Sequence, residues 1–244
     1  MVKFPLPRAE GVTELIDEPG IGSQELSANL QDLERLNHLF GGTRLILRYL
    51  GPILRRANAG EVRILDVATG GADIPAAIVA WARRQGWRVR IVGIDKNPQV
   101  LRAAAERIRG YPEIRLELGD ALALPYPAGS FDIVLCSLAL HHLTYRDGIA
   151  LLTSLDKIGR RGFIVNDLLR SWHGYLLTWL AMRLFRRGRL VRHDGPVSVR
   201  RAYTPSELLA MVERAGVAGV RIHSHPFFRV ALVKERVHDR GAAC

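Results

Sequence analysis

The sequence predicts an α/β protein built around a mostly parallel sheet. Apolar stretches of strand length alternate with stretches of helical periodicity from about residue 62 to residue 166. Each of the first three apolar strands leads into an acid: Asp66, Asp95 and Asp120. The last two strands are separated only by residues 224–226, so they should form a hairpin, with the final strand antiparallel to its neighbours.

Residues 1–58 predict an N-terminal arm followed by a helical cap. Prolines and glycines make the first residues irregular. Leucines at helical spacing predict a helix over Glu25–Phe40. A second helix is expected over Thr43–Ala57, where Pro52 should kink or divide it because proline removes a backbone hydrogen bond. These helices either close over an active site or pack against the sheet.

Residues 59–244 predict the domain that holds the sheet. Its elements are defined by apolar runs of strand length that alternate with stretches of helical periodicity, and by the helix-start pair Asn97-Pro98. In chain order we expect strand 62–66, helix 73–85, strand 88–94, helix 98–109, strand 113–118, strand 131–136, helix 146–157, strand 161–166, helix 205–215 and strands 217–223 and 227–233.

An insertion over about residues 168–203 separates the last two strands from the rest. It begins with an amphipathic stretch from Trp172 to Phe185, and five arginines follow between residues 183 and 192. We expect a helical lid that shapes an apolar acceptor pocket. Tryptophans beside arginines also suit contact with a membrane surface, although a packed lid helix with a solvated basic end explains the same pattern.

The stretch Ile64–Pro75 combines a buried strand, a turn of small residues and a helix start. Small residues let the backbone approach a ligand, and the first helical N–H groups are free to donate. In open α/β sheets, ligands lie beyond the carboxyl ends of the strands. An acid after the second strand can accept both hydroxyls of a ribose, and one after the third can accept an amine. The array indicates a nucleoside-bearing ligand.

Four segments stand in the order found in class I S-adenosylmethionine-dependent methyltransferases: DVATGGAD, GIDKNP, GDALALPYPAGSFDIVLCSLALHH and RRGFIVND. Over about Arg35–Val233 the chain resembles small-molecule enzymes of the quinone-biosynthesis or polyketide O-methyltransferase kind. The resemblance implies a Rossmann-like seven-stranded methyltransferase sheet and S-adenosylmethionine as cofactor. The chain departs from the family in having Ala68 and Ala72 where glycine is usual, and we expect both to avoid positive φ.

The resemblance also implies which residues meet the methionine end of the cofactor. Asp66, Ala68 and Gly70 should line it, with the loop backbone making much of the contact. Ser137, just past the fourth strand, should lie near the methionine carboxylate or the sulfonium.

The nucleoside end is assigned in the same way. Asp95 should hold the ribose hydroxyls, and Lys96 should flank the adenine. Asp120 should accept from the adenine amine, and Ala121 should donate its backbone N–H to the ring. A helix cap or a surface charge is the alternative for each acid, and it fits the strand-end positions of Asp95 and Asp120 less well.

Histidines are the candidates for a general base, since their pKa lies near neutrality. His142 ranks first, because the resemblance implies that residues after the fourth strand lie near the transferred methyl. His193 and then His173 follow, since both fall in the lid. Each of them equally fits a hydrogen-bonded structural role. We expect no metal site, because the adjacent pair His141 and His142 matches no ligand spacing.

The leading hypothesis is methyl transfer to a hydroxyl, or to carbon, of a lipophilic phenolic, quinone or polyketide molecule, as in secondary metabolism. The net charge of +11 and the pI of about 10.4 also suit an RNA or protein methyltransferase. The segment CSLALHH after the fourth strand argues against methylation of nucleic-acid bases. A catalytically silent cofactor-binding protein of the same fold is the third alternative.

The expected location is the cytoplasm, with peripheral membrane contact at most. The two cysteines form no disulfide framework, which is typical of a reduced compartment. The first residues have no long apolar core, and no stretch is long enough to span a membrane. The sequence makes no prediction of the oligomeric state.

Overall fold

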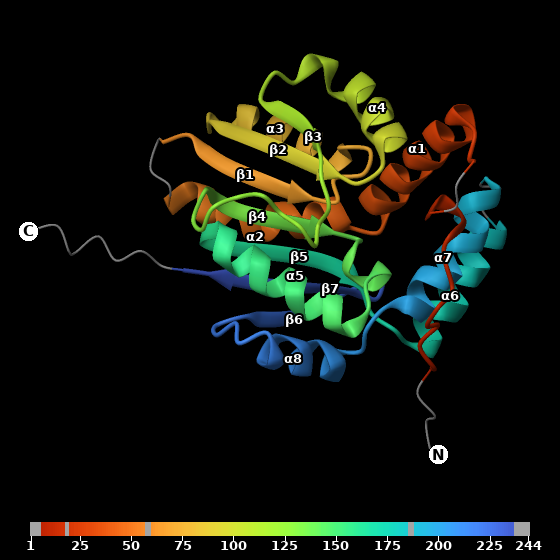
Figure 1. The fold of residues 1–244 in the computed structure, drawn as a ribbon. Coiled ribbons are helices and arrows are strands. Elements are labelled where there is room, and N and C mark those ends of the chain that lie inside the picture. The colour runs from red at the N-terminus through yellow and green to blue at the C-terminus, as the bar shows by residue number, and fades with distance from the viewer. Residues whose placement is uncertain (1–5, 18–19, 57–59, 185–187, 237–244) are drawn as a thin grey trace, which may run out of the picture.

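The structure, a computed structural model, describes residues 6–17, 20–56, 60–184 and 188–236. Within them a seven-stranded sheet has the order β3-β2-β1-β4-β5-β7-β6 (Figure 1). The strands are β1 (Val62–Val67), β2 (Val89–Asp95), β3 (Ile114–Leu118), β4 (Phe131–Ser137), β5 (Gly159–Leu168), β6 (Arg221–His225) and β7 (Arg229–Glu235). β1 to β5 are parallel, and β7 runs antiparallel to β5 and β6, which confirms the predicted fold class.

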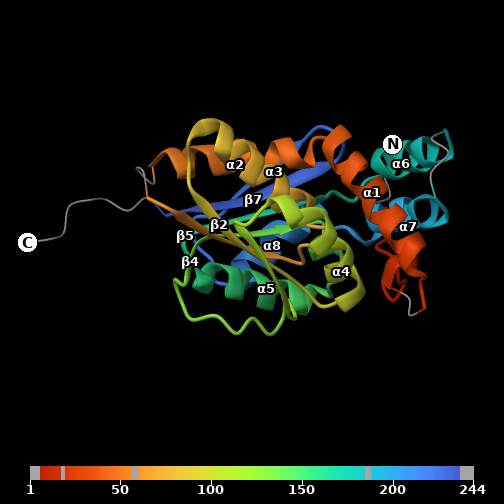
Figure 2. The same ribbon diagram turned by 90° about the horizontal axis from the view of Figure 1, so that it is seen from above.

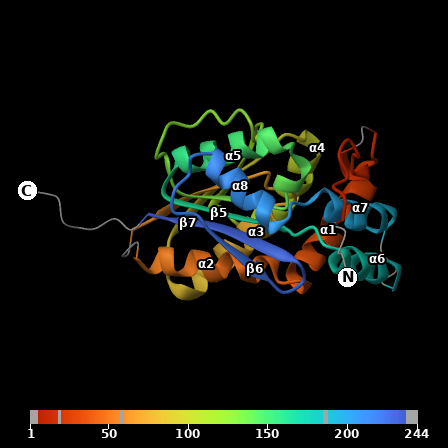
Figure 3. The same cartoon turned by 90° about the horizontal axis from the view of Figure 1, so that it is seen from below.

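Helices cover both faces of the sheet. They are α1 (Ser23–Leu39), α2 (Gly42–Arg56), α3 (Asp73–Gln85), α4 (Pro98–Arg107), α5 (Tyr145–Ile158), α6 (Trp172–Leu184), α7 (Arg189–Arg201) and α8 (Pro205–Arg214), with 3-10 turns η1 (Leu15–Asp17), η2 (Ile108–Gly110) and η3 (Leu140–His142). α2 and α3 pack on one face, and α5 and α8 pack on the other (Figures 2 and 3). This double cover explains why the central strands read as continuous apolar runs.

Pro52 lies inside α2, which continues unbroken to Arg56. Of the two effects expected of this proline, a kink or a division of the helix, the division is therefore absent. Its neighbours Leu50 and Ile53 are buried in the core between α2, α3 and the sheet. Burial of that whole apolar face outweighs the loss at Pro52, which costs about 3 kcal/mol in a helix interior.

The predicted hairpin is present, but its strands lie further along the chain than expected. His225 pairs with Arg229, so the turn consists of residues 226–228. Phe227 and Phe228 adopt φ values of 59° and 55°, a left-handed conformation that favours glycine or asparagine. The Phe227 ring centroid lies 5.4 Å from that of Phe40, next to α1. Backbone strain of this kind tends to concentrate at functional sites.

Segments far apart in the sequence gather at the carboxyl edge of the parallel strands, namely residues 6–17, α1 and the pair α6–α7 (Figure 1). The Asp194 carboxylate of α7 accepts the N–H groups of Leu15 and Ile16 at 2.8 and 3.1 Å. The insertion is thus a helical pair that anchors the N-terminal segment. No helix among the described residues is long and apolar enough to cross a membrane. Outside the described residues lie Ala57, Phe185, Arg186, Arg187 and Cys244.

The loop between β1 and α3 contradicts the expectation for its alanines. Ala68 and Ala72 adopt φ values of 55° and 57°, inside the left-handed region that both were expected to avoid. Backbone bonds hold the loop in place: the Thr69 N–H donates to the Ile94 carbonyl at 2.8 Å, and the Gly70 N–H donates to the Asp95 carboxylate at 3.0 Å. These anchors outweigh a strain of about 1–2 kcal/mol for each alanine.

Replacing Ala68 with glycine should therefore stabilise the protein. We expect the free energy of unfolding to rise by about 0.5–1 kcal/mol, which is the strain relieved less the extra backbone entropy of glycine in the unfolded chain. The control, Ala105→Gly at an exposed position within α4, should lower it by about 1 kcal/mol. Urea denaturation followed by circular dichroism measures both, and equal losses in the two variants would contradict the strain at Ala68.

Candidate functional site

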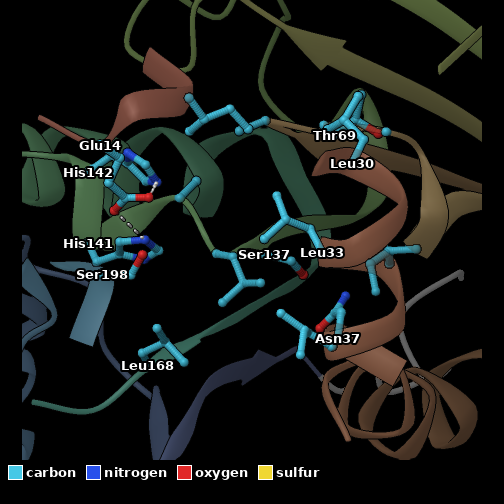
Figure 4. Close-up of a pocket in the computed structure, with 18 of the residues that line it drawn as sticks. Glu14, Leu30, Leu33, Asn37, Thr69, Ser137, His141, His142, Leu168 and Ser198 are labelled. Carbon is cyan, nitrogen blue, oxygen red and sulfur yellow. Dashed lines mark ion pairs between the residues drawn. The ribbon is translucent and has the colours of Figure 1, made fainter. Parts of the chain in front are cut away.

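A cavity of about 580 Å³ opens at the carboxyl edge of the parallel strands. Residues that follow β1, β2, β3 and β4 line it together with the N-terminal segment, α1, α6 and α7. Figure 4 shows Glu14 beside His141 and His142 at one side, and Thr69 beside Leu30 of α1 at the other. All eight residues predicted to bind a cofactor line it: Asp66, Ala68, Gly70, Asp95, Lys96, Asp120, Ala121 and Ser137. The strand-end acids thus share one cleft, whose volume suits a small organic ligand.

Asp95 ties two strand-end loops together. Its Oδ2 accepts the N–H of Gly70 at 3.0 Å, and its Oδ1 accepts the N–H of Asn97 at 2.9 Å. Burial raises the pKa of the Asp95 carboxyl, and these backbone donors oppose the rise. Each carboxylate oxygen has two lone pairs, so both can still accept a bond from a ligand hydroxyl.

Asp66 is buried beneath the loop that follows β1. The Thr69 hydroxyl donates to Asp66 Oδ2 at 2.7 Å, whereas Asp66 Oδ1 is buried without a hydrogen-bond partner. Burial, together with the Asp73 and Asp95 carboxylates, raises the pKa of Asp66 to about 7. A cationic group of a ligand would favour its ionised form.

The remaining predicted cofactor residues occupy different depths. Asp120 is exposed at the rim, where its Oδ1 accepts the N–H of Leu122 at 2.9 Å. Lys96 is also exposed. Ser137 lies deeper, and its Oγ is buried without a hydrogen-bond partner. Both ends of the cleft therefore present polar groups.

A buried arginine in the cavity lining carried no signal in the sequence. Arg229 begins β7, is only 4% exposed, and donates from Nη1 to Asn166 Oδ1 at 3.3 Å. Its Nε and the Asn166 Nδ2 are buried without partners. Burial lowers the pKa of Arg229 to about 10, although Asp167 and Asp73 oppose that effect. Buried donors without partners are costly, so this pair suits an anionic ligand group.

His141 lies in a chain of carboxylates and imidazoles. Its Nδ1 is 2.6 Å from Asp167 Oδ1, and its backbone N–H donates to Asp167 Oδ2 at 3.0 Å. Its Nε2 is 3.5 Å from Glu14 Oε1. Burial lowers the pKa of His141, but Asp167 and Glu14 outweigh it and raise the pKa to about 10. The His141 imidazole is therefore a cation at neutral pH, as long as no other cation neutralises Asp167 and Glu14.

His142 faces the same glutamate. Its Nδ1 is 2.9 Å from Asp17 Oδ2, and its Nε2 is 3.7 Å from Glu14 Oε2 (Figure 4). The His142 hydrogen bond lowers the pKa of Asp17, and both histidines lower the pKa of Glu14 although burial opposes them. Glu14 and Asp17 belong to the segment predicted to be an irregular arm, so sequence reasoning missed them.

Among the histidines predicted as bases, His142 lines the cavity and the other two do not. His193 lies on α7 with its Nδ1 2.9 Å from Asp194 Oδ1, so these sequence neighbours do face each other. His173 is exposed on α6. The geometry favours His142 and adds His141 and Glu14 to the candidate groups.

The other wall of the cavity is apolar. Its side chains come from the N-terminal segment, α1, α6, α7 and the β6–β7 turn: Ile16, Leu30, Leu33, Leu36, Phe40, Leu177, Met182, Val199, Phe227 and Phe228. Such a wall can bind a lipophilic molecule and exclude water from the polar groups opposite.

Comparison with known proteins gives the domain class. Residues 64–162 match the family model described as a methyltransferase domain. A demethylmenaquinone methyltransferase of Deinococcus radiodurans is 39% identical over 39% of this chain and 42% of its own length. A ubiquinone/menaquinone biosynthesis C-methyltransferase of Geobacter sulfurreducens is 30% identical over 53% and 51%. The matched part thus spans about half or less of these relatives.

Solved structures agree on the fold. A SAM-dependent methyltransferase from Aquifex aeolicus has a TM-score of 0.55 at 14% identity, covering 86% of this chain and 98% of its own. Human N-acetylserotonin methyltransferase, solved with SAM, has a TM-score of 0.61 at 15% identity, covering 88% and 57%. The predicted resemblance to S-adenosylmethionine-dependent methyltransferases is confirmed, and residues 64–162 are the part of this chain that matches the methyltransferase-domain model.

The ion pairs of His141 predict how stability depends on pH. Folding raises the pKa of His141 from 6.5 to about 10, so its contribution is complete below about pH 6.5 and is lost as the pH rises through about 10. Without added divalent ions, the melting temperature of the wild type should fall more steeply between about pH 7 and about pH 10 than that of His141→Gln. Scanning fluorimetry at several pH values measures both slopes, and equal slopes would contradict the ion pairs.

Proposed function

We propose that this chain is an S-adenosylmethionine-dependent methyltransferase that acts on a lipophilic phenol or quinol. The observation that carries the proposal is a single cavity that joins the strand-end acids Asp66, Asp95 and Asp120 to an apolar wall. The family match at residues 64–162 covers the strands that supply these acids. The cofactor would occupy the acidic side, and the acceptor would lie against α1, α6 and α7.

The polar groups of the cavity fit this cofactor. Asp66 Oδ1 and Ser137 Oγ are buried atoms without hydrogen-bond partners. Bound close to Asp66, the ammonium and sulfonium groups of S-adenosylmethionine would offset the cost of burying a carboxylate. The positive φ of Ala68 shapes the loop that lines this end.

The carboxylate of the methionine end needs donors, and Arg229, which lines the cavity, would supply them with Asn166 packed behind it. Asn166 lies beside Ser137 in the register of β4 and β5. The unpartnered Arg229 Nε and Asn166 Nδ2 are therefore close to the end of the cavity assigned to methionine. A charge-assisted bond there would satisfy donors that otherwise stay buried and unpaired.

At the nucleoside end, Asp95 would hold the ribose hydroxyls through the free lone pairs of its two oxygens. The rim position of Asp120 suits the adenine amine. The backbone N–H of Ala121 would meet the ring, and Lys96 would flank it. These roles follow the expectations drawn from the sequence.

When bound, S-adenosylmethionine supplies a methyl group that its sulfonium already activates. The chain must add correct position, exclusion of water and removal of the acceptor proton. The apolar wall serves the first two needs. For the third, Glu14, His141 and His142 lie in the same lining, where a phenolic hydroxyl can lose its proton.

The names of the relatives support a quinol-like acceptor. One is named for demethylmenaquinone, and the other is named for ubiquinone/menaquinone biosynthesis and for C-methylation. A ring carbon next to a hydroxyl and the hydroxyl oxygen itself are both made nucleophilic by loss of the same proton. We therefore include carbon and oxygen as accepting atoms and keep polyketide-like phenols within the acceptor class.

Helix α6 offers a route for such an acceptor. Between 39% and 57% of the surface of five of its apolar side chains is exposed: Trp172, Leu176, Leu177, Trp179 and Leu180. Leu177 also lines the cavity. The Arg183 guanidinium lies 4.1 Å from the centre of the Trp179 ring. An apolar surface next to arginines suits peripheral contact with a membrane that holds the acceptor.

Asp95→Asn should weaken cofactor binding and abolish most methyl transfer. Loss of charge-assisted bonds to two hydroxyls should raise the dissociation constant of S-adenosylhomocysteine about 10- to 100-fold. The control is Glu106→Gln, an exposed acid of α4, which should bind as the wild type does. Calorimetry measures binding, and transfer of labelled methyl to a panel of quinols and phenols measures activity. Wild-type protein that binds no cofactor would refute the proposal.

Cofactor affinity should also depend on pH through Asp66. Because its pKa is raised to about 7, Asp66 becomes an anion only above neutral pH, and the anion favours the cationic methionine end. We expect the affinity for S-adenosylmethionine to rise about threefold to tenfold between about pH 6 and about pH 8. Asp66→Asn should remove this rise. If the affinity of Asp66→Asn still rises with pH, the rise comes from the titration of another group.

A further inference from the structure

We propose that Glu14, His141 and His142 bind one divalent first-row transition metal ion, such as Zn²⁺ or Fe²⁺, in the wall of the cavity. Their candidate ligand atoms all lie within 4.8 Å of one another. The expectation of no metal site rests on the spacing of His141 and His142 alone, and the sequence does not reveal Glu14 as their neighbour in space. The Asp194 carboxylate brings them together, since it holds the backbone at Leu15 and Ile16.

Both imidazoles point the same nitrogen at the glutamate. His141 Nε2 is 3.5 Å from Glu14 Oε1, and His142 Nε2 is 3.7 Å from Glu14 Oε2 (Figure 4). Metal bonds of about 2.1 Å would require the three groups to draw together by about 1 Å. The rings belong to one 3-10 turn, and their centroids are 4.3 Å apart.

The opposite nitrogen of each ring is held by a carboxylate. His141 Nδ1 lies 2.6 Å from Asp167, and His142 Nδ1 lies 2.9 Å from Asp17. A carboxylate on Nδ1 fixes the proton there, orients the ring and makes Nε2 a better ligand, as is usual for metal-bound histidine. The cluster has this arrangement twice.

Glu14 adds an independent observation. The residue is 4% exposed, it lines the cavity, and its Oε1 is buried without a hydrogen-bond partner. A buried carboxylate oxygen is costly unless a donor or a cation meets it closely. His141 Nε2 approaches Glu14 Oε1 only to 3.5 Å without forming a hydrogen bond, and a metal ion between Glu14 and the two imidazoles would bind that oxygen more closely.

Charge balance allows an ion to replace protons. Glu14, Asp17 and Asp167 surround the two imidazoles, so the cluster is anionic unless cations compensate. One divalent ion carries the same charge as two protons. A metal ion binds Nε2 only after that nitrogen has lost any proton it holds, so binding to an imidazolium releases a proton. The competing state is a metal-free cluster in which the His141 imidazolium pairs with Asp167 and Glu14.

Two imidazoles and one carboxylate leave coordination positions open for water or substrate. Resting on the proposed function, we assign one such position to the acceptor hydroxyl. Coordination would lower the pKa of that hydroxyl, so the ion would take over the part otherwise given to His142 as base.

Titration with metal ions tests the inference directly. Chelator-stripped protein is titrated with Co²⁺, followed by its visible absorption, and with Zn²⁺ by calorimetry in two buffers of different ionisation enthalpy. We expect one ion per chain and release of protons. Glu14→Gln and His142→Ala should each weaken binding by about 100-fold or more, and Asp17→Asn by about 10- to 100-fold. His38→Ala, which removes an exposed histidine of α1, should change nothing.

Two outcomes would overturn the inference. One is wild-type protein that binds no stoichiometric Co²⁺ or Zn²⁺, which would identify the cluster as ion pairs alone. The other is binding that Glu14→Gln and His142→Ala leave unchanged, which would place the ion elsewhere. Circular dichroism of the same samples reports correct folding. If folded wild-type protein binds no S-adenosylhomocysteine, the proposed function is refuted and the metal result stands.

Discussion

Carboxylates are buried at one edge of this sheet, and much of the surrounding structure supplies them with partners. Asp167 meets His141, Asp95 accepts two backbone N–H groups, and Asp194 accepts two more from the N-terminal segment. Asp66 and Glu14 each keep one buried oxygen without a hydrogen bond, although His141 Nε2 lies 3.5 Å from that of Glu14. In a medium of low polarity, such atoms require a cation or a donor. The unsatisfied atoms therefore mark where ligands belong.

The sheet and the acidic side of the cavity could be predicted from the sequence because their signals are local. Strand periodicity places Asp66 and Asp95 at strand ends, and parallel strands bring those ends to one edge. Glu14, Asp17 and Arg229 could not be predicted in this way. They reach the cavity through tertiary contacts, such as the hydrogen bonds between Asp194 and the N-terminal segment. Such contacts produce no periodic pattern in the sequence.

Local rules also failed where tertiary contacts override them. Ala68 and Ala72 take positive φ because a loop anchored by backbone bonds demands it. Pro52 stays inside α2 because the face around it is buried. The histidines were ranked by their place in the chain, but only the structure separates His142, which lines the cavity, from the exposed His173.

The turn of Phe227 and Phe228 bears on attempts to engineer this protein. An asparagine–glycine pair would suit that backbone better, yet both rings line the cavity. Directed evolution that rewards heat resistance alone would favour replacing them. The selected variants would be more heat-resistant but would lack the two rings that shape the cavity. Turnover therefore has to be screened alongside thermal tolerance.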